Sequence, residues 1–231
     1  MASPLTIVVT GSNRGIGHGI INLLANTQHP QPLHIYATSR GGVDLKIQAK
    51  PPNEIRYAKL DVSDKSSITS FLKTALNDSG KIDVLINNAG INSNNNETPD
   101  AAEQVINVNY HGTKQMCQLF LSEGKMSSTP NARIVNVSST ASSLSNYPST
   151  TASHFRSATS ISDVDTLAQE YINAVKSSSQ EAAGFGAPPK SYQVSKALMN
   201  ALTVVLAHWE AAEDVGGGGE DTGEVGGWAA W

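Results

Sequence analysis

The 231-residue sequence has a single cysteine, Cys117, and no long apolar run. One cysteine cannot form an internal disulfide framework and suits a reducing compartment. No apolar segment reaches the length of about 20 residues that spans a bilayer, and the N-terminus lacks the basic-then-apolar pattern of a secretory signal. We therefore expect a cytoplasmic protein without a membrane segment, in which Cys117 contributes to packing.

Positive charge and histidine are also sparse. The chain has 16 Lys and Arg against 20 Asp and Glu, a formal net charge of −4, and no basic run. Because nucleic-acid surfaces need clustered basic residues, we expect no nucleic-acid partner. The six histidines are scattered without the spacing of metal ligands, so we expect no metal site.

What is present is an alternation of strand and helix patterns. Short apolar, β-branched runs predict buried parallel strands at 7–9, 33–39, 55–60, 82–86 and 134–137. Apolar residues at helical spacing predict helices at 16–24, 64–76, 100–121, 163–176 and 192–213. This alternation predicts a doubly wound α/β fold, in which helices cover both faces of one parallel sheet.

Helix caps and the weaker segments complete the organisation. Ser63 and Ser162 are the expected N-caps of two helices. Residues 41–53 are rich in Gly and Pro and support at most a short helix, whereas the Ser, Thr, Ala and Asn composition of 140–160 is typical of a linker. We expect one domain over 1–213, with an insert at about 140–190, and a disordered, acidic, Gly-rich tail over 214–231.

The first chemical signal lies between Leu5 and Gly17. An apolar strand enters a glycine-rich turn, and a helix pattern follows at once. This geometry brings backbone N–H groups and a helix N-terminus up to a phosphate, and glycine leaves room for that approach. The expected dinucleotide-binding turn comprises Gly11, Ser12, Asn13, Arg14, Gly15, Ile16 and Gly17.

A second signal is the segment Tyr192-Gln-Val-Ser-Lys196, which places Tyr and Lys on one face of a helix. It lies downstream of Ser139, at the carboxyl end of a predicted strand, where open α/β sheets bind ligands. Together with the T-G-x-x-x-G-x-G turn, the segment 87–90 (Asn-Asn-Ala-Gly) and Asn109, this order resembles the short-chain dehydrogenase/reductase family.

The resemblance implies roles for four residues. Tyr192 would be the general acid that protonates a carbonyl oxygen, and Ser139 would hydrogen-bond that oxygen. A free phenol has a pKa of about 10, so it needs the nearby charge of Lys196, which in the family also holds the nicotinamide ribose. Asn109 would relay protons through water to the lysine, although Asn107 is close enough to leave this alignment open.

The end of the second predicted strand indicates the cofactor. An NAD-preferring fold usually has an acidic residue there, whereas this chain has Thr38-Ser39-Arg40. Arg40 can pair with a 2′-phosphate, and Arg14 can flank it, so we expect NADPH. By resemblance, Asp61 and Val62 would hold the adenine, and Asn88, Ala89 and Gly90 would line the central part of the cofactor, with Tyr192 and Lys196 at its far end.

The spacing of 53 residues from Ser139 to Tyr192 is long for the family. This form, including Phe155-Arg156-Ser157 and the helix that follows, resembles the carbonyl reductase subgroup. The resemblance implies NADPH-dependent reduction of ketones, aldehydes or quinones. In that subgroup the inserted helix covers the face that other members use to form tetramers, so we expect a monomer.

The segment after Leu206 departs from the family pattern. It contains no β-branched run, and no Pro-Gly pair follows Lys196. We therefore expect a sheet without the family's last strands and with its fifth strand as an exposed edge. Two alternatives remain: a catalytically inactive NADP-binding protein, and an interaction module built on that edge and the 228–231 tail.

Overall fold

A computed structural model describes residues 3–93 and 97–216, with side chains up to residue 208. The described residues form two compact units, of which the first comprises 3–89 with 115–137. The second comprises 90–114, without the gap at 94–96, and 138–216. Across these residues, no helix combines the length and the apolar character that crossing a membrane requires.

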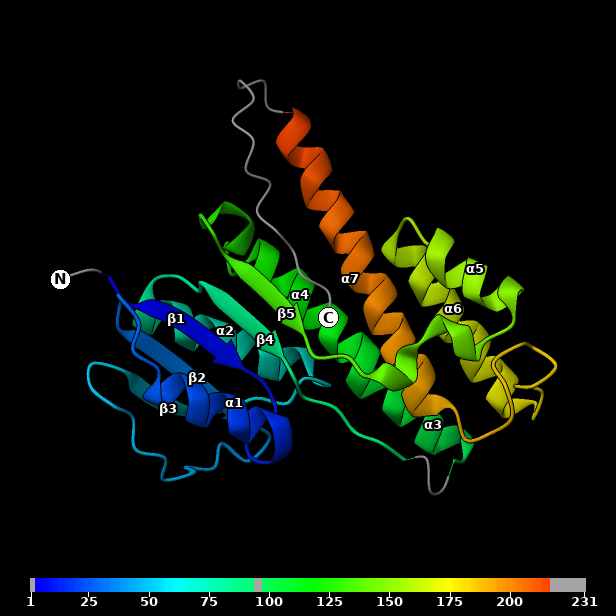
Figure 1. Cartoon of the computed structure of the whole chain (residues 1–231), viewed down its shortest axis with the longest axis horizontal. Coiled ribbons are helices and arrows are strands. Elements are labelled where there is room, and N and C mark those ends of the chain that lie inside the picture. Colours follow the sequence, from blue (N-terminus) through cyan, green and yellow to red (C-terminus); the bar gives the residue numbers. More distant parts are fainter. Residues whose placement is uncertain (1–2, 94–96, 217–231) are drawn as a thin grey trace. The chain divides into compact units, whose positions relative to one another are not determined.

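The first unit contains a parallel sheet of five described strands in the order β3-β2-β1-β4-β5 (Figure 1). The strands are β1 (Leu5–Val9), β2 (Leu33–Ser39), β3 (Glu54–Lys59), β4 (Val84–Asn87) and β5 (Arg133–Asn136). The first and last residue of each strand lie within two residues of those predicted from the sequence. Sheet order reverses at β1, because β2 and β4 flank it on opposite sides.

One face of the sheet packs on helix α1 (Gly15–Asn26). Parallel pairing places Ile7 of β1 beside Ile35 of β2, and both belong to a buried aliphatic cluster with Ile21 and Ala25 of α1. None of these four side chains is more than 5 % exposed. Burial of a large aliphatic side chain contributes roughly 1.5–3 kcal/mol, so this layer anchors the helix that follows the glycine turn.

The opposite face packs on α2 (Lys65–Ser79) and α4 (Thr113–Ser122). The Tyr36 ring of β2 meets the Phe71 ring of α2 edge-on, with centroids 5.6 Å apart. Phe71 in turn stacks on Phe120 of α4 at 6.5 Å. Helices therefore cover both faces, and the predicted doubly wound α/β class is confirmed.

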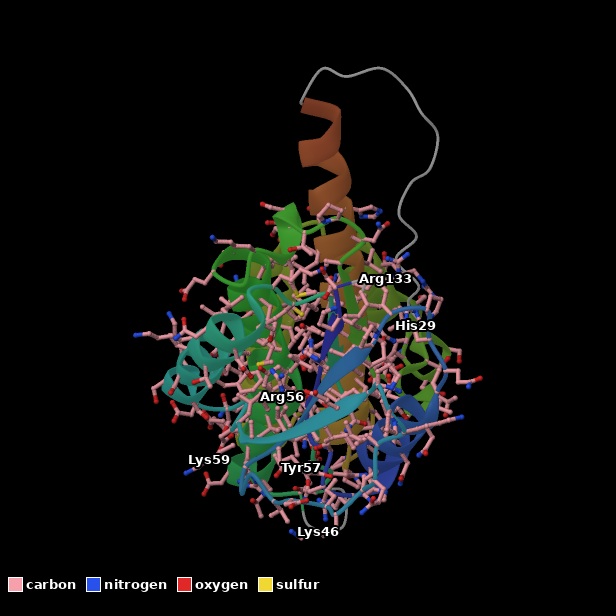
Figure 2. The ribbon with its side chains drawn as sticks, turned by 90° about the vertical axis from the view of Figure 1, so that its left-hand side faces the viewer. His29, Lys46, Arg56, Tyr57, Lys59 and Arg133 are labelled. Atoms are coloured by element: carbon pink, nitrogen blue, oxygen red, sulfur yellow. The ribbon has the colours of Figure 1, made fainter. Side chains whose placement is uncertain are left out.

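Strand β3 lies at one end of the described sheet, and Figure 2 shows Arg56, Tyr57 and Lys59 along it. Arg56 is paired with Asp78 of α2 at 2.5 Å and with Glu54 at 3.3 Å. Charged side chains on an outer strand disfavour pairing with another chain.

One local prediction in this unit needs correction. The N-cap of α2 is Asp64, whose carboxylate accepts from the backbone N–H of Ser66, so the prediction of Ser63 was wrong. Ser63 instead donates its hydroxyl to Asp61 at 2.6 Å. Residues 41–53, all of which are described, contain no helix.

The second unit is helical. Its longer helices are α3 (Pro99–Ile106), α5 (Ser149–Ser157), α6 (Ile161–Lys176) and α7 (Ser191–Gly216). Within it, α7 packs against both α3 and α6, and Figure 1 shows the three together. The predicted tail begins inside α7, because 214–216 continue this helix, and its remaining part lies outside the described residues.

The predicted single helix 100–121 is interrupted. A six-residue π-helix, η1 (Asn107–Gly112), separates α3 from α4. Such π-turns contain one extra residue, which the spacing of apolar residues does not reveal, and they occur frequently at functional sites.

The linker-like composition of 140–160 also misled the prediction. This segment forms the short 3₁₀ turns η3 (Thr140–Ser142) and η4 (Leu144–Asn146), followed by α5. Its buried aromatic rings, Tyr147 and Phe155, pack against each other at 5.6 Å. These two aromatic residues therefore help to anchor a segment whose composition is otherwise polar.

The cap of α6 lies two residues before the predicted one. Ser160 accepts from the backbone N–H of Asp163 at 3.2 Å, and Asp163 accepts from that of Ser160 at 2.9 Å. This reciprocal capping box satisfies two otherwise unpaired backbone donors. Ser162, the residue predicted as the cap, lies inside the first turn.

Candidate functional site

The glycine turn after β1 is closed too tightly for side chains at two of its positions. A Cβ on Gly11 would lie 2.8 Å from the Cα of Ala89, and Gly11 has φ of +64°. A Cβ on Gly17 would lie 2.4 Å from the carbonyl oxygen of Gly11. Gly15 also has positive φ, +56°, but no atom lies within 4 Å of its Cβ position. The turn is thus packed against β4 on one side and open at Gly15.

A hydrogen-bonded network joins this turn to the end of β4. The hydroxyl of Thr10 accepts from the backbone N–H of Asn88 at 3.0 Å and from that of Ala89 at 2.9 Å. The side-chain amide of Asn88 donates to the carbonyls of Thr10 and Gly11 at 2.9 and 3.1 Å. Thr10 was missed as a site residue, although it stands directly before the first glycine of the turn.

Helix α1 starts from this turn with its first residues at the surface. Ser12 is buried and donates its hydroxyl to the carbonyl of Thr38, whereas Asn13, Arg14 and Gly15 are exposed. Ile16 is 66 % exposed, and the first turn of the helix contains no acidic residue. Free N–H groups and the helix dipole therefore favour an anion at this end of α1.

Arg40, Asp61 and Val62 follow the paired strands β2 and β3. Ser39 pairs with Lys59 at the end of these strands, so the residues after them lie at the same edge of the sheet. Arg40 is exposed and Val62 is buried. Asp61 accepts from the backbone N–H of Ser63 at 3.0 Å, which holds its side chain within the loop.

In the second unit, α7 places Tyr192 and Lys196 one turn apart. The Lys196 ammonium lies 5.9 Å from the centre of the Tyr192 ring, within reach of a cation–π interaction. Lys196 is 4 % exposed, and burial lowers its pKa to about 8. Tyr192 is only partly buried. A buried positive charge therefore lies beside an accessible phenol.

Asn109 is fully buried in η1 and connects three parts of the unit. Its side-chain oxygen accepts from the N–H of Ile91 at 2.8 Å, and its amide donates to the carbonyl of Ile91 and to the hydroxyl of Ser195, both at 2.9 Å. A Cβ on Gly90 would lie 3.3 Å from the Asn109 oxygen and 3.7 Å from the Lys196 nitrogen. Gly90, Asn109 and Lys196 thus converge, whereas Asn107 is exposed.

Ser139 lies in the loop that η3 continues, and its hydroxyl caps that turn by accepting from the N–H of Ala141 at 3.2 Å. Its carbonyl accepts from the N–H and the hydroxyl of Ser142. Ser142 in turn accepts from the side-chain amide of Asn200 in α7 at 2.9 Å. Ser142 and Asn200, neither of which was predicted, therefore tie the Ser139 loop to the helix that carries Tyr192.

The second unit also contains a cavity of about 320 Å³ beside η3 and α7. Its lining includes Ser142, Phe155, Arg156 and Asn200, but none of Ser139, Tyr192, Lys196 and Asn109. It is therefore separate from the residues that converge on Lys196.

Two further observations concern reactive groups. Cys117 is fully buried, and burial raises the pKa of its thiol to about 12, as expected for a packing residue. Across 3–93 and 97–216, no group of three or more His, Cys, Asp or Glu residues is arranged to hold a metal ion.

Comparison with known proteins identifies relatives of the chain. The short chain dehydrogenase family matches residues 5–158, so this match ends before Tyr192. The (+)-neomenthol dehydrogenase of Arabidopsis thaliana is 32 % identical, with 89 % of this chain and 78 % of that protein covered. Carbonyl reductase (NADPH) 1 of Mus musculus is 31 % identical, with 87 % and 73 % covered.

Solved structures agree with this fold. Menthone neomenthol reductase from Mentha piperita superposes with a TM-score of 0.73 at 23 % identity, over 90 % of this chain and 86 % of that one. Salutaridine reductase from Papaver somniferum superposes with a TM-score of 0.74 at 25 % identity, over 89 % and 82 %.

Proposed function

Because the chain belongs to the short-chain dehydrogenase/reductase family of oxidoreductases, which use nicotinamide cofactors, we propose that it reduces a ketone, aldehyde or quinone carbonyl to an alcohol with NADPH. The observation that carries this proposal is the buried Lys196 ammonium beside the Tyr192 ring. A phenol needs such a charge to exchange protons near neutral pH.

The residues of the first unit fit the phosphate and adenine half of a dinucleotide. Its glycine turn excludes side chains at Gly11 and Gly17, and the first turn of α1 offers backbone donors without a competing acid. The proposed contacts are Gly11, Ser12, Asn13, Arg14, Gly15, Ile16 and Gly17 for the pyrophosphate, Asp61 and Val62 for the adenine, and Asn88 and Ala89, together with Gly90 of the second unit, for the central part.

Arg40 and Arg14 support NADPH over NADH. Both are exposed and follow the carboxyl ends of the neighbouring strands β2 and β1. A guanidinium can bind phosphate oxygens through two parallel N–H donors. No acidic residue occupies the end of β2, where a carboxylate would hold a ribose 2′-hydroxyl and repel a 2′-phosphate.

The second unit supplies the proposed acid chemistry. A bound nicotinamide would provide the hydride that reduces the carbonyl carbon. Tyr192 donates its phenolic proton to the carbonyl oxygen, and the Lys196 charge stabilises the resulting phenolate. Ser139 donates a hydrogen bond to the same oxygen, where negative charge develops. Lys196 and Tyr192 also contact the nicotinamide ribose in this proposal.

Asn109 is the fourth proposed catalytic residue. Its amide is held by Ile91 and Ser195, which keeps it beside Gly90 and Lys196. We assign it the proton relay from solvent to Lys196 through water. Its two backbone contacts would hold that relay in place during turnover.

The oligomeric state and the location of the protein are also proposals. We propose a monomer, because α6 of the insert packs on α3 and α7 of its own chain, and in the carbonyl reductase subgroup that the chain resembles the inserted helix covers the face that other members use to form tetramers. We also propose a cytoplasmic location, in keeping with the buried thiol of Cys117.

Replacement of Tyr192 by Phe tests the proposed function. The variant should lose carbonyl reduction, measured as NADPH oxidation over a panel of ketones, aldehydes and quinones, and should bind NADPH within about twofold of the wild type. An NADP-binding protein without turnover is the alternative. This alternative predicts that the wild-type chain binds NADPH but reduces no carbonyl. If Tyr192→Phe instead lost NADPH binding and turnover equally, the assignment of Tyr192 as general acid would be contradicted.

A further inference from the structure

A carboxylate lies at the start of the helix that carries Tyr192 and Lys196. One oxygen of Glu97, Oε1, accepts from the backbone N–H of Ser191 at 2.6 Å and from that of Lys190 at 2.9 Å. Glu97 comes from the loop before α3, more than ninety residues away in sequence. The contact is therefore specified by the tertiary fold.

The position of this carboxylate suits a helix N-terminus. The first N–H groups of a helix have no partner within the helix, and the helix dipole favours negative charge there. Hydrogen bonds from N–H groups to a carboxylate are shorter and stronger than neutral ones. Since Ser191 is the first residue of α7, the bond to its N–H fixes the backbone one residue before Tyr192.

Tyr171 of α6 holds the same carboxylate oxygen. Its hydroxyl donates to Oε1 of Glu97 at 2.9 Å, and its ring packs edge-on against Phe185 with centroids 5.2 Å apart. Tyr171 is fully buried, and burial raises the pKa of its phenol far above the neutral range. The hydroxyl therefore remains a donor, and the inserted helix α6 is connected through Glu97 to the first turn of α7.

We propose that Glu97 is a positioning residue for Tyr192, acting through the backbone of Ser191, and that Tyr171 orients its carboxylate. This inference rests on the proposed function, because it assigns Tyr192 the role of general acid. It gives the insert a second task besides covering α3 and α7. Through Tyr171, the insert orients the Glu97 carboxylate that fixes the helix turn from which the phenol projects.

Hydrogen–deuterium exchange of the peptide covering 188–196 tests whether Glu97 holds the first turn of α7, and it does so without measuring activity. In Glu97→Ala, the amides of Lys190 and Ser191 should exchange about tenfold or more faster, because they lose their acceptor. Glu97→Gln keeps a carbonyl acceptor and should restore most of the protection. Thr98→Ala is the matched control, since it removes the N-cap of α3 one residue away and should leave this peptide unchanged.

Turnover of the same variants separates positioning from general stability. Glu97→Ala should lower kcat for carbonyl reduction about tenfold while NADPH affinity stays within about twofold, and Glu97→Gln should recover most of kcat. Tyr171→Phe keeps the ring and its contact with Phe185 but removes the donor, so it should give smaller changes of the same kind. Thr98→Ala should keep wild-type kcat.

The outcomes distinguish this inference from the proposed function. Unchanged exchange in Glu97→Ala, or unchanged kcat where Tyr192→Phe is inactive, overturns the positioning role. Faster exchange together with no carbonyl reduction by the wild-type chain supports the cap and refutes the proposed function.

Discussion

The Lys196 ammonium lies 5.9 Å from the centre of the Tyr192 ring and is almost completely shielded from water. Burial of a cation disfavours its charged form, which is why the pKa of Lys196 falls to about 8. The helix thus maintains a costly charge at the position where a phenolate would need it. Such a cost is expected where the charge serves catalysis rather than folding.

The first prediction concerns the pH dependence of stability. Between about pH 8 and 10.5 the unfolded chain keeps the Lys196 proton that the folded chain has released, so the free energy of unfolding rises with pH in this window. Replacement of Lys196 by Met removes that rise. It should raise the free energy of unfolding at pH 7 by up to about 3 kcal/mol, while carbonyl reduction is lost.

Urea unfolding of both proteins from pH 7 to 10 measures this effect, because other titrating groups cancel in the difference. A difference between wild type and variant that does not change with pH would contradict the lowered pKa.

The second prediction uses two glycines of the same helix. A Cβ on Gly17 would lie 2.4 Å from the Gly11 carbonyl oxygen and 2.5 Å from the Asn88 amide, so Gly17→Ala should destabilise the fold by roughly 1–3 kcal/mol and weaken NADPH binding. No atom lies within 4 Å of the Cβ position of Gly19. Gly19→Ala should therefore stabilise the helix by about 0.5–1 kcal/mol and leave binding unchanged. Thermal melts with and without NADPH compare the pair.

The third prediction addresses the choice of cofactor. Arg40→Asp should weaken NADPH binding about tenfold or more and leave NADH nearly unaffected, because it replaces a phosphate-binding group by a repelling one. The midpoint of thermal unfolding reports both affinities, since a ligand at a hundredfold excess over its dissociation constant stabilises the folded state by about 2.7 kcal/mol.

Arg133, at the start of β5, is the matched control for Arg40. It is exposed, its guanidinium donates to the carbonyl of Asn131, and as the first residue of β5 it lies at the end of that strand opposite the carboxyl end. Arg133→Asp should keep the wild-type preference. If Arg40→Asp also kept it, the argument for a 2′-phosphate contact would be lost.

The fourth prediction separates Asn109 from Asn107. Asn109→Ala leaves partners at the part-buried Ile91 and the buried Ser195 without their hydrogen bonds and should cost about 2–4 kcal/mol of unfolding free energy together with most of the turnover. Asn107→Ala changes an exposed side chain and should cost less than about 0.5 kcal/mol. Urea unfolding and single-substrate kinetics decide between them, and equal effects would refute the assignment to Asn109.

The sheet could be predicted from the sequence because each strand is specified by a short run of neighbouring residues. The run 7–9, Ile-Val-Val, is apolar on both faces, which is typical of parallel strands, and Gly11 follows it. The glycine turn could also be predicted from the sequence, since only glycine tolerates the close contacts at positions 11 and 17. Local patterns misplaced the N-cap of α6 by two residues, because Ser160 and Ser162 are both suitable capping residues.

The connections that organise the second unit could not be predicted from local patterns. Asn200 reaches Ser142 across 58 positions, and Glu97 reaches Ser191 across 94. Neither residue type is unusual in its own segment, so nothing short of the tertiary fold identifies its partner. The pairing of Tyr192 with Lys196 could be predicted, because their spacing in the sequence is that of one helical turn.

The π-helix η1 constrains how this sequence can vary. Each residue of an α-helix turns the chain by about 100°, so deletion of Val108, which precedes Asn109 in this segment, would rotate Asn109 by about that angle relative to α3. The side chain would then leave Ile91 and Ser195 while the helix itself became more regular. Helix propensity alone would therefore predict no harm from a one-residue deletion at this point. Selection would nevertheless remove it, because Asn109 would lose its contacts. The length of this segment should thus tolerate less change over evolutionary time than its composition.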